Sequence, residues 1–251
     1  MIEAAAWGAI GASTLLLGAM VAFAIDVPPR IRGLILAFGA GALFGAVAYE
    51  LFEDAVAASM GGIDVLVGFA SGAIVFYVGS VLIDRLGGDG DAAPADGGPR
   101  IASRRDQRND GLSVVLGSVL DGIPESVVLG ASLIGGAGVG IPVLVAIAVS
   151  NVPEGLSATE DLTKGGFSRR RIVLVWSTVV VASTLAAAFG FAVLSMAGPS
   201  VTAFVNAFAA GAILAMLAET MIPEANEIGG RAVGLATALG FAIAASLSFL
   251  A

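Results

Sequence analysis

The sequence predicts an all-α polytopic membrane protein with eight transmembrane helices. Of the 251 residues, 57% are hydrophobic and only 13% are charged, whereas an average soluble domain has roughly 25% charged residues. The mean hydropathy of +0.96 agrees with this composition. The apolar runs are long and continuous, while the strands of a membrane β-barrel alternate apolar and polar residues over about ten positions. Helices are therefore expected to span the bilayer.

Eight stretches each carry about twenty predominantly apolar residues, which is the length that crosses the hydrocarbon core. They lie at about 4–25, 31–53, 63–83, 111–134, 141–162, 171–195, 200–222 and 231–250. The whole chain, 1–251, is treated as a single transmembrane domain. The segment 84–110 is rich in Gly, Asp and Pro and has few side chains to bury, so it is expected to be a flexible cytoplasmic loop.

The basic residues predict the orientation of these spans. All twelve Lys and Arg residues fall in, or directly at the edges of, the loops between spans 1 and 2, 3 and 4, 5 and 6, and 7 and 8. Short loops rich in Lys and Arg stay in the cytoplasm. Eight spans place all four loops on that side, so we expect a multi-pass protein of the cell (inner) membrane with both termini extracytoplasmic.

Two internal similarities indicate an inverted repeat. Residues 37–55 match residues 207–225 at a constant offset of 170, and residues 121–125 match residues 150–154 at an offset of 29. The pairs are spans 2 and 7 and spans 4 and 5, whose numbers differ by five and by one. Because both differences are odd, the two members of each pair run in opposite directions through the bilayer. Such inverted-topology repeats are typical of secondary transporters.

The composition also excludes several functions. The chain has no Cys and no His, so thiolate zinc sites, imidazole ligands and Ser-His-Asp triads are excluded. No pair of nucleophile and base is evident, and we expect no enzyme activity. The net charge of −8 and the pI near 4.4 exclude a nucleic-acid partner, which needs a basic face. The expected partner is the lipid bilayer.

Three carboxylates inside the apolar spans are the most informative residues. A charge at the bilayer centre costs at least about 2.5 kcal/mol and tends to mark a functional site. Asp121 and Glu125 lie about 15 to 21 Å along a hydrocarbon core of about 30 Å, and Glu154 reaches a similar depth from the opposite side. Helical spacing places Asp121 and Glu125 on one face, and Ser150 and Glu154 on one face of the next span.

A proline precedes each of the two glutamates. Pro124 and Pro153 lack the amide donor that a helix needs and are expected to break their helices beside the site. No basic residue is predicted deeper in a span than its first two residues. The acids are therefore either protonated or neutralised by an external cation.

A divalent cation satisfies three clustered carboxylates better than a proton does. Oxygen ligands suit hard or borderline ions such as Mn²⁺ and Fe²⁺, and carboxylates also bind Zn²⁺. The side chains proposed to bind the metal share the two polar faces of spans 4 and 5: Asp121, Glu125, Ser150, Asn151 and Glu154.

Further polar residues flank this depth and predict a cation pathway across the bilayer. Acidic groups at the mouths of such a pathway concentrate cations. Acids at the ends of spans are also commonly solvated interfacial residues, and this alternative stays open for each of them. The predicted pathway residues are Glu50, Glu53, Asp54, Ser157, Asp161, Glu219 and Glu224.

Four segments resemble the ZIP family of divalent-metal transporters. Residues 121–126 (DGIPES) and 150–155 (SNVPEG) resemble the His-Asn-x-Pro-Glu-Gly-type motifs of its spans 4 and 5, and residues 37–41 and 210–225 resemble its spans 2 and 7. The resemblance implies eight spans in a 3+2+3 inverted repeat and a metal site, often binuclear, bridged by Glu125 and Glu154. This chain has Asp121 in place of the motif histidine and Gly122 in place of its neighbouring asparagine.

The sequence thus predicts inward transport of a divalent metal ion, zinc, iron or manganese, by alternating access through a carboxylate-rich site. Two alternatives stay open. One is a proton-coupled carrier of another solute that uses the same acids. The other is a transport-dead membrane protein that binds or senses metal. Association into a homodimer is also left open.

Overall fold

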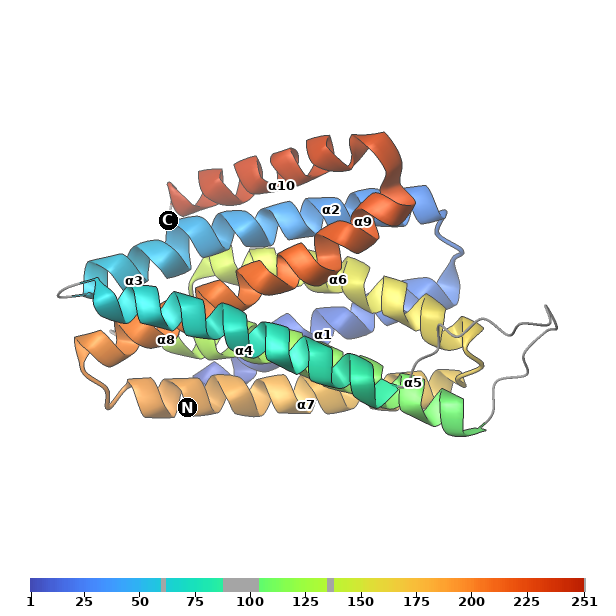
Figure 1. Cartoon of the computed structure of the whole chain (residues 1–251), viewed down its shortest axis with the longest axis horizontal. Coiled ribbons are helices and arrows are strands. Elements are labelled where there is room, and N and C mark those ends of the chain that lie inside the picture. The colour runs from blue at the N-terminus through green and yellow to red at the C-terminus, as the bar shows by residue number, and fades with distance from the viewer. Residues whose placement is uncertain (60–61, 88–103, 135–137, 251) are drawn as a thin grey trace.

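The computed structural model describes residues 1–59, 62–87, 104–134 and 138–250, and this part of the chain is helical without any strand. The helices lie side by side in one elongated bundle (Figure 1). Seven helical stretches of the described residues are long and apolar enough to cross a membrane. For the described residues, the prediction of an all-α protein is confirmed, and the long apolar helices indicate that it is embedded in a membrane.

The helices follow the predicted spans closely. Two of them continue through five-residue π-helical segments, η1 and η2, and a 3₁₀ turn, η3, precedes the last. The elements are α1 Ile2–Ala24, α2 Pro29–Ala46, η1 Val47–Leu51, α3 Phe52–Ala58, α4 Ile63–Gly87, α5 Arg104–Ser132, α6 Ile141–Lys164, α7 Arg169–Leu194, α8 Pro199–Met216, η2 Leu217–Met221, α9 Ile222–Gly229, η3 Gly230–Ala232 and α10 Val233–Ser248.

One predicted boundary differs from the structure, and two predicted spans fall in a single apolar stretch. Helices α4 and α5 extend into both ends of the segment expected to be a loop, 84–110, and residues 88–103 lie outside the described part of the chain. The predicted spans 200–222 and 231–250 fall in one apolar stretch of 50 residues, Pro199–Ser248. This stretch turns at Gly230, whose φ of 72° lies in the left-handed region that favours glycine. Beyond the turn, α10 runs in the direction opposite to α9 (Figure 1).

The described basic residues all lie at one end of the bundle, on the right in Figure 1. This end contains the starts of α2, α5 and α7, the ends of α4 and α6, and the turn between α9 and α10. We call it the basic end. The two chain termini lie toward the opposite end. Of the twelve basic residues, Arg100 lies outside the described part of the chain.

Helices α2 and α8 have corresponding structures. Each has 18 residues, begins with a proline and continues into a five-residue π-helical segment. Each also crosses a neighbour at a glycine: a Cβ on Gly41 would lie 1.9 Å from the Thr237 carbonyl oxygen of α10, and a Cβ on Gly211 would lie 2.0 Å from the Phe69 carbonyl oxygen of α4. Close approach of the two backbones requires glycine at both crossings.

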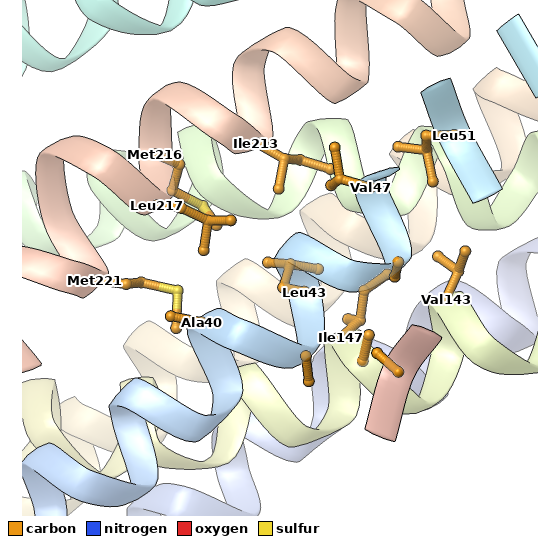
Figure 2. Packing of buried hydrophobic residues seen from close by; sticks show 14 of the residues in the cluster. Ala40, Leu43, Val47, Leu51, Val143, Ile147, Ile213, Met216, Leu217 and Met221 are labelled. Carbon is orange, nitrogen blue, oxygen red and sulfur yellow. The ribbon is translucent and has the colours of Figure 1, made fainter. Parts of the chain in front are cut away.

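Two apolar clusters hold α6, which carries part of the site. In the larger one, Leu43 and Val47 of α2 and η1 pack with Ile147 of α6 and with Ile213 of α8 (Figure 2). The second surrounds Trp176 of α7 and ties it to α1 and α6. Trp176 is fully buried, and its Nε1 donates a hydrogen bond of 2.8 Å to Thr159 Oγ1 of α6. These contacts fix α6 between α2 on one side and α1 and α7 on the other.

Candidate cation site

Two of the predicted acids meet at one internal cavity. Glu125 of α5 and Glu154 of α6 both line a cavity of about 10 Å³ enclosed by α1, α5, α6 and α7. This volume is about the space that one water molecule occupies. Only 3% of Glu125 is exposed. Since α5 and α6 run in opposite directions (Figure 1), the cavity brings together carboxylates from two antiparallel helices.

The crossing of α1 and α6 shapes one wall of this cavity. A Cβ on Gly155 would lie 2.3 Å from the Leu15 carbonyl oxygen, and a Cβ on Gly18 would lie 2.1 Å from the Val152 carbonyl oxygen. Beside this crossing, Asn151 Nδ2 donates a hydrogen bond of 3.2 Å to the Gly11 carbonyl oxygen of α1. Because the amide nitrogen is used in this way, the carboxamide oxygen is the atom of Asn151 that suits a cation.

The other two predicted ligands are not brought to the cavity. Ser150 donates a hydrogen bond of 3.0 Å to the Ile147 carbonyl oxygen of its own helix and packs against α2 at Gly39. Asp121 is half-buried in α5 and is not among the residues that line the cavity. In the described residues, no group of three or more acidic side chains is arranged to hold a metal ion. The cavity itself therefore presents two carboxylates and one amide.

Three serines that line the cavity were not predicted. Ser118 and Ser126 come from α5, and Ser183 comes from α7. Ser118 precedes Glu125 by seven residues, two helical turns, so helical spacing would have placed it on the same face. Ser183 lies opposite Gly122, where a Cβ would be 3.0 Å from its Oγ. No pattern in the sequence indicates that α7 packs here.

The prolines do not interrupt the helices. Both α5 and α6 continue through Pro124 and Pro153, so the predicted helix breaks are wrong. Membrane helices tolerate proline where neighbouring helices compensate for the lost hydrogen bond. The packing of α6 against α1 and α2 provides such neighbours. The glutamates therefore project from regular helices.

The central acids have no basic partner in the part of the chain that the structure describes. Glu154 is close enough to Asp121, Glu125 and Glu224 to feel their charges. The ion pairs among the described residues all involve the last turns of α6, near the basic end. None of these ion pairs includes Glu125 or Glu154.

The basic end contains an ion pair that differs from the sequence prediction. Arg32 was expected in a loop, but it lies in the first turn of α2, is only 5% exposed, and pairs through Nη1 with Glu160 Oε2 of α6. The boundary prediction placed it wrongly because α2 begins at Pro29, earlier than its apolar run. Nearby, Ser157 donates a hydrogen bond to Glu224 of α9.

Some of the remaining pathway residues line a cavity, and others lie on the surface of the bundle. Glu50 and Asp54 line a cavity of about 50 Å³ at the end of the bundle away from the basic residues. Glu53 and Glu219 are exposed on the bundle surface. Asp161 is also exposed, and its carboxylate lies 3.3 Å from Lys164 Nζ. The predicted continuous ladder of acids is thus only partly brought to internal cavities.

No protein-family model matches this chain, and no curated protein matches it. The resemblance of residues 121–126 and 150–155 to the ZIP motifs stays a prediction.

Proposed function

We propose that the protein carries a divalent metal ion across the cytoplasmic membrane through the cavity between α5 and α6. One observation supports this most strongly. Glu125 and Glu154 face the same small cavity inside an apolar bundle, and within the described residues no basic side chain pairs with them. Two uncompensated carboxylates in such surroundings are costly, and a bound divalent cation neutralises both.

The donor atoms at the cavity favour particular metals. Two carboxylates, the Asn151 amide oxygen and the serine hydroxyls form a set that contains only oxygen. Such ligands suit Mn²⁺ and Fe²⁺ and also accept Zn²⁺. The small volume and the two carboxylates are suited to a single ion, with water completing its coordination. A binuclear centre, which the ZIP resemblance implies, would need Asp121 to move to the cavity.

Eight membrane crossings in an inverted repeat are part of this proposal. The matching lengths and π-helical segments of α2 and α8, which run in opposite directions in Figure 1, support the repeat. The turn at Gly230 divides the 50-residue apolar stretch into two crossings. With the basic end in the cytoplasm, both termini are extracytoplasmic and inward transport proceeds toward the basic end.

A proton-coupled carrier of another solute is the second candidate. The same unpaired acids, in a cavity with room for about one water molecule, would suit a proton relay. Uptake that follows a pH gradient in the absence of any divalent ion would favour this candidate over the first.

Uptake into proteoliposomes tests the proposal. The protein is expected to take up Mn²⁺, Fe²⁺ or Zn²⁺, and the Glu125→Gln/Glu154→Gln double variant is expected to lose both uptake and equilibrium binding. Glu3→Gln, which changes an exposed acid outside the predicted pathway, is the matched control and should retain both. Full uptake by the double variant would overturn the proposal, and binding without any flux would indicate a metal sensor.

A further inference from the structure

Two side-chain contacts tie the last turns of α6 to its neighbours. Ser157 donates a hydrogen bond to Glu224 of α9, and Glu160 pairs with Arg32 of α2. Both partners of the ion pair are largely buried, with side chains 6% and 15% exposed for Arg32 and Glu160. These contacts join α6 to two separate elements of the bundle.

The contacts lie between the central cavity and an open basin at the basic end. A helical rise of 1.5 Å per residue places Ser157 about 4.5 Å and Glu160 about 9 Å from Glu154 along α6, toward the basic end. Glu160 also lines a basin of about 350 Å³, together with Asp26, Lys164 and Arg169. Along the axis of α6, both contacts therefore lie between the central cavity and this basin.

We propose that the Arg32–Glu160 and Ser157–Glu224 contacts form a latch that closes the basic end, with Arg32 as a tethered counter-ion of Glu160. A divalent ion that leaves the central cavity replaces Arg32 as the partner of these carboxylates. The replacement of Arg32 by a divalent ion rests on the proposed function, whereas the latch itself does not.

The bonding of the pair suits repeated opening. Arg32 Nε and Glu160 Oε1 are buried without a hydrogen-bond partner in the described structure, so the guanidinium does not use the two-bond fork that makes Arg–carboxylate pairs strongest. Glu160 Oε1 therefore stays free to accept a cation while Oε2 holds Arg32. A fixed positive charge on the path of a divalent cation repels it, so Arg32 must move before the ion passes.

Lys164 provides a matched control within the same cluster. Its Nζ lies 3.7 Å from Glu160 Oε2, but its side chain is 65% exposed. Exposed ion pairs contribute little because water and salt screen them. Replacing Lys164 thus removes a positive charge beside Glu160 without opening the buried pair.

The chain contains no cysteine, so a single introduced thiol can report on access to the cavity. Ala12 of α1 lines the central cavity and is 5% exposed. In the Ala12→Cys protein, we expect slow labelling by a membrane-impermeant thiol reagent added at the basic end. Adding Arg32→Gln should raise the labelling rate at least tenfold, whereas adding Lys164→Gln should leave it unchanged. An unchanged rate with Arg32→Gln would overturn the latch.

The Arg32→Gln/Glu160→Gln double variant covers the case in which Arg32→Gln alone does not fold. It removes both charges of the pair and leaves neither buried charge uncompensated, so it is expected to fold. It should label as fast as Arg32→Gln does. Slow labelling of this folded double variant would also overturn the latch.

Manganese binding tests the counter-ion role separately. In a Glu125→Gln/Glu154→Gln background, which removes the central site, Arg32→Gln is expected to create Mn²⁺ binding that Glu160→Gln abolishes. No new binding would overturn the counter-ion role. Failure of the proposed function would appear differently, as wild-type protein that binds no divalent ion while the labelling results still hold.

Discussion

The central cavity and the basic end both contain buried acids, but they compensate them differently. At the basic end, Glu160 is paired with Arg32 and lies near Lys164, so the chain supplies its own cations. At the cavity, Glu125 and Glu154 have no such partner among the described residues. Under the proposed function, Glu160 serves the structure of the resting protein, whereas Glu125 and Glu154 bind the external cation.

The largest expected difference between the two regions is in metal affinity. Glu125→Gln removes a carboxylate from the cavity and should weaken Mn²⁺ binding more than about 100-fold, since even changes beyond the direct ligands cost 10–100-fold. Glu160→Gln should change the affinity of the central site less than threefold, because its charge is already matched by Arg32. Titration calorimetry of both variants makes the comparison, and equal losses would contradict it.

The free energy of unfolding should depend more on the ion pair at the basic end than on the acids of the cavity, the reverse of the order expected for metal affinity. Arg32→Gln leaves Glu160 buried beside only an exposed lysine, and breaking a buried pair costs about 3–5 kcal/mol. Glu125→Gln removes an unpaired buried charge and should leave the metal-free protein at least as stable as the wild type. Chemical denaturation in detergent compares the free energies of unfolding. If Arg32→Gln left the protein stable and Glu125→Gln destabilised it, the structural role would belong to Glu125 and not to the Arg32–Glu160 pair.

The glycine crossing of α1 and α6 beside the cavity should affect the stability of the protein through close packing and not through charge. Gly155→Ala would force a Cβ to within 2.3 Å of the Leu15 carbonyl oxygen and should destabilise the protein by about 1–3 kcal/mol. Gly117→Ala in α5 is the control, because a Cβ there meets nothing within 4 Å and alanine favours a helix. Thermal unfolding of the two variants should separate them, and similar melting temperatures would exclude the tight crossing.

The smallest effect is expected for the exposed cation at the basic end. Lys164→Gln should lower the free energy of unfolding by less than about 1 kcal/mol, because exposed ion pairs contribute little. High salt should reduce even this difference. A loss as large as that of Arg32→Gln would show that Lys164, and not Arg32, is the main partner of Glu160.

Helical spacing and depth were sufficient to predict that Glu125 and Glu154 converge. Both quantities are local, and the long apolar runs set most of the helix boundaries within a few residues. The same spacing placed Ser150 with Glu154, yet the face of α6 is wide enough to contact two neighbours. Ser150 therefore packs against α2 while Glu154 faces the cavity.

Contacts between distant segments were not predictable from the sequence. Ser183 belongs to a helix whose packing partners no motif indicates. Arg32 was assigned to a loop because charge was taken as the boundary of the span. In the structure, Arg32 is buried and pairs with Glu160, which lies 128 residues later in the sequence. Such a pairing depends on how the helices pack and cannot be predicted from local patterns.

Anomalous diffraction from crystals soaked with Mn²⁺ tests most directly whether the cavity acids bind an external cation. The account predicts one anomalous peak between the carboxylates of Glu125 and Glu154, with the Asn151 amide oxygen as a further ligand and Arg32 still on Glu160. An anomalous map without a peak at this cavity, or a basic side chain that occupies the cavity, would contradict the claim that the cavity acids bind an external cation.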